Sequence, residues 1–160
     1  MIRPANTDDV ERIASLYNYY VANTIATFEE EPVTVAEMQT RLTTVITSNP
    51  WFVAEEEGSI VGYAYAGQFE RRASYRHSVE TSVYLDRARV GNGFGMRLYT
   101  ALLGDLRARG RHCAIGRIAL PNDASIALHE RLGFENVAHL REIGFKFNQW
   151  IDVGYWELLL

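Results

Sequence analysis

The chain has 160 residues, of which 48% are apolar, and it carries a formal net charge of −4. This length fits one domain with a buried core, which we expect to span residues 1–160. The acidic balance argues against nucleic acid and membranes as partners, and no apolar run reaches the ~20 residues that cross a bilayer. Its single cysteine, Cys113, excludes an intrachain disulfide and favours a cytoplasmic location.

The first half of the sequence alternates between extended and helical patterns. Residues 1–4 are predicted as a short strand, and Thr7 as the N-cap of a helix with two aspartates in its first turn. A second amphipathic helix is predicted from about residue 34 to residue 46, where an Asn-Pro pair soon follows and stops it. Two β-rich runs around Gly58 predict a hairpin.

In the second half, the segment 78–86 alternates as a strand does, with Glu80, Ser82 and Tyr84 on one face. A glycine cluster then leads into a helix that ends near Gly110. The elements predicted after it are a strand over 112–120, a helix over 122–132 closed by Gly133, and strands near 137–147 and 155–160 around a turn region at 150–152. Together these elements predict a mixed α/β fold whose last strands are antiparallel.

Three alternate glycines, Gly91, Gly93 and Gly95, stand between the predicted strand and helix. Glycines let the backbone approach a ligand closely, and the free amides of a helix's first turn attract an anion such as a pyrophosphate. A flexible turn without a ligand is the alternative. The G-x-G-x-G spacing at mid-chain differs from the Rossmann fingerprint, and no G-K-[ST] sequence provides a loop for a nucleoside triphosphate.

Two motifs resemble the acyl-CoA-binding motifs of the GNAT acetyltransferase superfamily. The first, [QR]-x-x-G-x-[GA], is matched by Gly93 and Gly95, whereas Val90 stands where Gln or Arg is usual. The second, N-x-x-[AS]-x-x-[LF]-[YH]-x-x-x-G-F, is matched throughout by NDASIALHERLGF, residues 122–134. The resemblance implies the GNAT fold, a mixed, mostly antiparallel, twisted sheet of about seven strands flanked by about four helices.

Longer stretches resemble one branch of this superfamily, the phosphinothricin and methionine sulfoximine/sulfone N-acetyltransferases. The matching pieces are NTIATFE (23–29), RASY (72–75), SVETSVY (78–84) and WIDVGYW (150–156). The resemblance implies acetyl-CoA as co-substrate, a small-molecule amine as acceptor, and a homodimer. Another acceptor, such as a protein N-terminus or a polyamine, is one alternative, and a non-catalytic acyl-CoA-binding module is the other.

The resemblance gives Glu80 the role of general base. An ammonium group must lose a proton before it attacks a thioester, and such help is typically worth ~10²–10⁴-fold in rate. A surface glutamate on an exposed sheet face is the alternative. In this superfamily, backbone amides of the strand before the glycine turn bind the pantetheine arm and the oxyanion, which implies that Val83, Tyr84 and Leu85 contact the cofactor.

His129 stands where many superfamily members have a tyrosine acid. An imidazole can protonate the leaving CoA thiolate, but it can instead orient the substrate or simply pack on its helix. The resemblance also places Asn122 and Ser125 in the cofactor groove. The remaining cofactor residues that we predict belong to the glycine turn, namely Val90, Gly91, Asn92, Gly93, Phe94, Gly95 and Met96.

The resemblance assigns the acceptor to two segments. Phe28 and Glu29 would form a wall of its pocket, with plain core packing as the alternative for Phe28. Arginine binds carboxylates in bidentate fashion, so the arginines near residue 72 favour an anionic small molecule over a polyamine. The residues predicted in this second segment are Arg72, Ala73, Ser74 and Tyr75. The four histidines are scattered without an H-E-x-x-H pattern, so no metal is expected.

Overall fold

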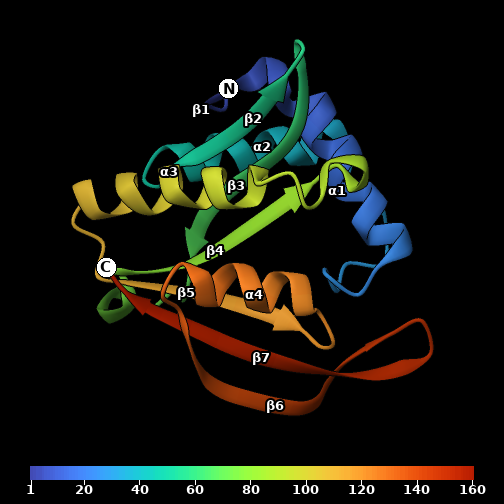
Figure 1. The fold of residues 1–160 in the computed structure, drawn as a ribbon, viewed down its shortest axis with the longest axis vertical. Helices are drawn as coiled ribbons and strands as arrows, with labels where there is room; N and C mark the ends of the chain where they lie inside the picture. Colours follow the sequence, from blue (N-terminus) through green and yellow to red (C-terminus); the bar gives the residue numbers. More distant parts are fainter.

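The computed structural model describes residues 1–160, which form one seven-stranded sheet and four α-helices (Figure 1). The elements are β1 (Ile2–Pro4), α1 (Val10–Asn23), α2 (Val35–Ile46), β2 (Trp51–Glu56), β3 (Ser59–Gln68), β4 (Ser78–Leu85), α3 (Phe94–Ala108), β5 (Cys113–Ala119), α4 (Asp123–Arg131), β6 (Glu135–Lys146) and β7 (Gln149–Leu159). The strand order is β1-β2-β3-β4-β5-β7-β6, and only β4 and β5 are parallel. This is the mixed, mostly antiparallel sheet that the sequence predicts.

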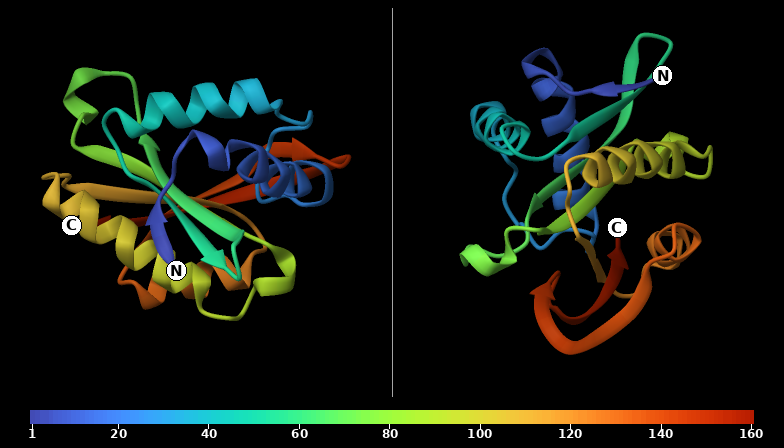
Figure 2. Two further views of the ribbon diagram at one scale, coloured as in Figure 1. Left: turned by 90° about the horizontal axis from the view of Figure 1, so that it is seen from above. Right: turned by 90° about the vertical axis from the view of Figure 1, so that its left-hand side faces the viewer.

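The helices cover both faces of the sheet, α1 and α2 on one and α3 and α4 on the other (Figure 2). Side chains alternate between these faces along a strand. Val53 and Tyr63 therefore belong to the core under α1 and α2, whereas their neighbours Ala54 and Ala64 belong to the core under α3. None of the four helices has the length and apolar character that a membrane span needs.

The sheet opens between its two parallel strands. The ladder joins residues 78–80 of β4 to residues 113–115 of β5 and ends there, although both strands continue. The two strands then diverge (Figure 1). Backbone groups of β4 beyond Glu80 that face β5 consequently have no strand partner and need another one. We call this region the sheet opening.

The first helix begins later than predicted. The expected N-cap, Thr7, is wrong, because Asn6 caps a 3-10 turn over residues 7–9 and α1 starts at Val10. Asp9 completes the capping box by accepting the Asn6 N–H, and it also accepts two hydrogen bonds from Arg3, both of 2.8 Å. These bonds fix an extra turn that the helical periodicity does not reveal.

The C-terminal hairpin also differs from the prediction. The turn lies at Phe147 and Asn148 rather than at residues 150–152, and β7 begins at Gln149 instead of Tyr155. Both turn residues have positive φ, 50° and 57°, as a two-residue hairpin loop that follows the strand twist requires. The stretch predicted as a turn alternates like a strand, because Ile151 is buried while its neighbour Trp150 is exposed.

Candidate active site

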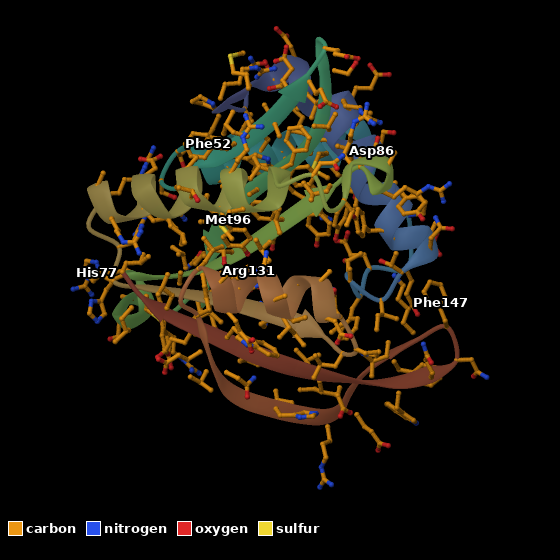
Figure 3. All side chains as sticks on the ribbon, in the orientation of Figure 1. Phe52, His77, Asp86, Met96, Arg131 and Phe147 are labelled. Atoms are coloured by element: carbon orange, nitrogen blue, oxygen red, sulfur yellow. The ribbon has the colours of Figure 1, made fainter.

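A cavity of about 530 Å³ lies between α3, α4 and the sheet opening. We call it the carrier cavity. Met96 of α3 and Arg131 of α4 line the space between the two helices (Figure 3). Ten of the predicted cofactor residues line this cavity, namely Val83, Tyr84, Leu85, Val90, Gly91, Gly93, Gly95, Met96, Asn122 and Ser125.

Two predicted cofactor residues do not line the carrier cavity. Phe94 is the first residue of α3 and turns its ring into the core, where it is buried. Asn92 is exposed in the turn, and its N–H donates to the carbonyl of Arg89 at 3.3 Å. Arg89 itself is ion-paired with Glu56. The G-x-G-x-G pattern thus marks the turn correctly but not the direction of these two side chains.

The turn before α3 is shaped by two glycines in the left-handed region. Gly91 has a φ of 87°, and Gly93, the N-cap of α3, has a φ of 78°. At position 95 a glycine is needed for a different reason: a Cβ there would lie 3.2 Å from the side chain of Leu128 of α4. The first turn of α3 has no acidic residue, so its free N–H groups form an unopposed positive helix end. This arrangement can bind a diphosphate.

On the edge of β4 that faces the sheet opening, the backbone groups of Leu85 are hydrogen-bonded to a side chain, whereas those of Val83 have no partner on β5. The Tyr20 hydroxyl donates to the Leu85 carbonyl at 2.6 Å, and the Leu85 N–H lies 3.3 Å from the same hydroxyl. Tyr20 is not among the residues predicted from the sequence. Backbone groups two residues apart point to the same side of a strand, so those of Val83 also face the sheet opening. There Val83 has no partner on β5.

A second cavity, of about 390 Å³, lies on the α1 side of the sheet opening. We call it the acceptor cavity. Residues 25–28, which follow α1, form one wall and place Phe28 in the lining, while Glu80, Ser82 and Tyr84 form another. The two cavities meet at the sheet opening, where they share Ala26, Ser82, Tyr84, Arg117 and Ala119.

Glu80 is ion-paired with Arg117, a residue that was not predicted from the sequence. Arg117 Nη2 donates to Glu80 Oε2, and these are the only charged residues that line the acceptor cavity. The hydrogen bond to Glu80 raises the pKa of Arg117 further, so its guanidinium stays charged. Arg117 lies two residues after Ile115, the ladder partner of Glu80, and so shares its face. Alternation alone could not find it without knowing which strands pair.

The other residues predicted for the acceptor lie away from this cavity. Residues 72–75 form an exposed segment before β4 and line neither cavity. The physical reason is that their loop enters β4 at the end where β4 and β5 are still paired. Glu29 is also outside the lining, because its carboxylate accepts a hydrogen bond of 2.6 Å from Arg41 of α2.

His129 is buried, with 3% of its surface exposed. Its Nδ1 lies 2.7 Å from the Ser125 carbonyl, which can only accept, so Nδ1 carries the hydrogen and Nε2 accepts from the Tyr99 hydroxyl at 2.9 Å. Gly116 makes room, since a Cβ there would lie 2.5 Å from Nε2. Burial lowers the pKa of His129, although the bond to Ser125 opposes this. A neutral ring with both nitrogens engaged fits a packing or orienting role better than proton donation.

Comparison with known proteins identifies the family to which this architecture belongs. The model of the family described as acetyltransferase (GNAT) domain matches residues 2–154. The chain belongs to the GNAT acetyltransferase family. The predicted family and fold are therefore confirmed, and this GNAT protein is an acyltransferase.

Individual relatives of this GNAT chain agree over nearly its whole length. A phosphinothricin N-acetyltransferase from Streptomyces viridochromogenes is 38% identical, over 98% of this chain and 85% of the relative. An L-methionine sulfoximine/L-methionine sulfone acetyltransferase from Pseudomonas aeruginosa is 37% identical, over 99% and 94%. The crystal structure of a GNAT superfamily phosphinothricin acetyltransferase from Sinorhizobium meliloti in complex with acetyl-CoA has a TM-score of 0.98 and 38% identity, over 100% of this chain and 88% of that chain.

Proposed function

We propose that the protein transfers the acetyl group of acetyl-CoA directly to the α-amine of a small amino-acid analogue of the phosphinothricin, methionine sulfoximine or methionine sulfone type. One observation carries this proposal: the carrier and acceptor cavities meet at the sheet opening and share five lining residues. A thioester on one side and an amine on the other can therefore meet without a covalent enzyme intermediate. The names of the relatives from Streptomyces and Pseudomonas support the acceptor class.

The carrier cavity fits acetyl-CoA by its chemistry. The positive end of α3 suits the diphosphate, and the unpaired edge at Val83 suits the amide groups of a pantetheine arm. The bound thioester supplies the acetyl group. Asn122 Oδ1 already caps α4 by accepting the Ser125 N–H at 3.2 Å, so the amide NH₂ of Asn122 is the part of this side chain that can donate to a ligand.

Glu80 is the general base of the proposed reaction. It is the only carboxylate that lines the acceptor cavity, and it takes the proton that the ammonium must lose. The freed amine then forms the N–C bond to the thioester carbonyl carbon, the attacking nitrogen loses its second proton to solvent, and the C–S bond breaks. Because a thiol has a pKa of about 8.5, the departing thiolate takes a proton from solvent without a strong acid. The neutral His129 accordingly orients the surrounding groups through Tyr99.

The proposed assembly is a homodimer that forms through the C-terminal hairpin. Five exposed apolar side chains lie on β6, β7 and their turn, and we call this set the hairpin patch: Val137, Ile143, Phe145, Phe147 and Trp150. The rings of Phe145 and Trp150 pack with their centroids 4.8 Å apart. Such exposed apolar side chains favour burial against a partner, and a second copy of this chain is the partner we propose.

The role of Glu80 is tested by measuring acetyl transfer to methionine sulfone, with the release of the CoA thiol as the signal. Replacing the base with Glu80→Gln should lower kcat by ~10²–10⁴-fold, while the Kd of acetyl-CoA stays the same. Glu55→Gln is the matched control, because Glu55 is also ion-paired with an arginine and is equally exposed, 25% against 24%. An unchanged kcat in Glu80→Gln excludes Glu80 as the base. Acetyl-CoA binding without turnover by the wild type identifies a non-catalytic module instead.

A further inference from the structure

The acceptor cavity contains one ion pair, and each of its two members could instead pair with a charged group of an acceptor. Glu80 on β4 and Arg117 on β5 face the same space, just past the point where the two strands stop pairing. Their side chains remain accessible, with 24% and 42% of their surfaces exposed. No other residue that lines the cavity carries a charge, so each of the two has only the other to neutralise it there.

An α-amino acid is the chemical complement of this pair. Its ammonium and carboxylate groups are attached to the same carbon, as the carboxylate and guanidinium of Glu80 and Arg117 are neighbours in the cavity. Arginine can bind a carboxylate through two parallel hydrogen bonds, whereas Glu80 can accept from an ammonium. One internal ion pair is thereby replaced by two ion pairs with the ligand.

We propose that Arg117 binds the carboxylate of the acceptor and, in doing so, releases Glu80 to face the acceptor's ammonium. This proposal rests on the proposed function and deepens it, because it assigns the acceptor's anionic group to a residue of the cavity. In the free protein, Arg117 occupies the carboxylate that must accept the proton. Transfer of the guanidinium to the acceptor's carboxylate leaves the Glu80 oxygens free for that proton.

The exchange makes the carboxylate part of substrate selection. An amine without a neighbouring anion leaves Arg117 paired with Glu80, and a polyamine brings a second positive charge toward the guanidinium. Both should be poor acceptors, since like charges repel and the base stays occupied. The segment 72–75, which was predicted for this role, does not line the cavity.

The test compares methionine sulfone with its carboxamide, which lacks the negative charge, in the wild type and in Arg117→Met. In the wild type, the carboxamide should have a KM about 10- to 100-fold higher, as expected for a lost charge-assisted contact. In Arg117→Met, the KM of methionine sulfone should rise by about the same factor, while that of the carboxamide changes little. Arg117→Lys should restore part of the difference. The amine of the carboxamide is less basic than that of methionine sulfone, but this difference is the same for every protein. It therefore cancels when the ratio of the two KM values is compared between the wild type and the variants.

Arg109→Met is the matched control, because Arg109 is also ion-paired and 41% exposed but lies at the far end of α3. It should keep the wild-type ratio of the two KM values, and the KM of acetyl-CoA should be unchanged in all variants. If Arg117→Met raises the KM of both acceptors equally, or lowers kcat for both equally, the substitution has caused a general structural defect and the inference is overturned. An Arg117→Met enzyme that still prefers the carboxylate also overturns it. A wild-type enzyme that acetylates neither acceptor overturns the proposed function itself.

Discussion

At the scale of single residues, His129 shows how burial sets a charge state. Its Nδ1–H donates to Ser125, its Nε2 accepts from Tyr99, and Tyr99 lies 3.2 Å from the Thr81 hydroxyl. No charged side chain takes part in this network. Burial lowers the pKa of the imidazole because the charged form loses its hydration. The folded protein consequently resists a proton that the unfolded chain accepts.

The stability of the protein should therefore depend on pH through His129. The contribution of the neutral ring is fully present above the unfolded pKa, about 6.5, and is lost as the pH falls toward the lower folded pKa. The slope should reach at most ~1.4 kcal/mol per pH unit in this window. Urea unfolding at a series of pH values measures it. In His129→Gln the slope should be smaller, and an equally steep slope in that variant rules out this origin.

Arg117 shows which part of the site the sequence could not reveal. The motifs located the glycine turn and the α4 helix from local spacing, and the resemblance to the branch pointed to Glu80. The partner of Glu80 lies 37 residues away and becomes visible only when β4 and β5 are known to be parallel neighbours in a given register. Residues 72–75 are the opposite case, a local match whose position in the fold excludes it from the cavities.

At the scale of elements, the glycines Gly93, just before α3, and Gly104, within α3, are in different conformations. Gly93 has a positive φ at the N-cap, whereas Gly104 lies in the helix, where a Cβ would meet nothing within 4 Å apart from the backbone of its own helix. Gly93→Ala should destabilise the protein by ~1–2 kcal/mol, since alanine is strained in that conformation. It should also weaken CoA binding by moving the amides of the first turn.

Gly104→Ala is the control within the same helix and should stabilise the protein by ~0.5–1 kcal/mol. Thermal unfolding with and without CoA measures both effects. Equal CoA affinity in Gly93→Ala and the wild type would show that the shape of this turn does not matter for the carrier.

The hairpin strand β6 holds the wall of the acceptor cavity. Lys146, the only lysine of the sequence, is 2% exposed. Its Nζ donates to the carbonyls of Val21, Thr24 and Thr27 at 2.8, 2.9 and 2.8 Å. Gly144 has no room for a Cβ because the Phe28 ring lies against it. The hairpin thus fixes residues 24–28 both by hydrogen bonds and by packing.

Removing this support should loosen the acceptor cavity more than the carrier cavity. In Lys146→Met, three carbonyls lose their donor, and the KM of methionine sulfone should rise about three- to tenfold, whereas the KM of acetyl-CoA should stay within about twofold. Steady-state kinetics with each substrate varied in turn separate the two. Equal increases in both KM values indicate a general loss of structure and contradict this role.

Element boundaries follow the sequence where local signals suffice. The helix predicted over 34–46 is confirmed, because Thr34 and Glu37 form a capping box. The 3-10 turn before α1 and the turn at residues 147–148 were not found. The first depends on the contact of Asp9 with Arg3, and the second on two non-glycine residues with positive φ, neither of which periodicity encodes.

At the scale of the whole molecule, the two helical layers and the interrupted sheet produce a site between them. α3 and α4 cover the carrier cavity, α1 and its following loop cover the acceptor cavity, and the sheet opening connects the two. The order of the predicted elements and the resemblance carried by the motifs predicted this mixed α/β architecture. They could not predict how the cavities meet, because that depends on the end of the β4–β5 ladder.

The hairpin patch predicts the association of two chains. Phe147 marks the exposed tip of this hairpin in Figure 3. Trp150→Glu should halve the mass measured by sedimentation velocity, because it places a charge among apolar side chains. Ile46→Glu, at an exposed apolar residue on α2, should leave the mass unchanged. A wild-type protein that sediments as a monomer contradicts the proposed dimer.

Hydrogen exchange with and without saturating acetyl-CoA tests the placement of the carrier most directly. With the carrier bound, we expect slower exchange in three segments, residues 81–85 at the sheet opening, 90–97 at the start of α3 and 122–129 in α4. Exchange in residues 35–46 of α2, on the opposite face, should not change. If exchange in the first three segments is the same with and without saturating acetyl-CoA, the result contradicts the central claim that α3 and the opened sheet hold the acyl carrier.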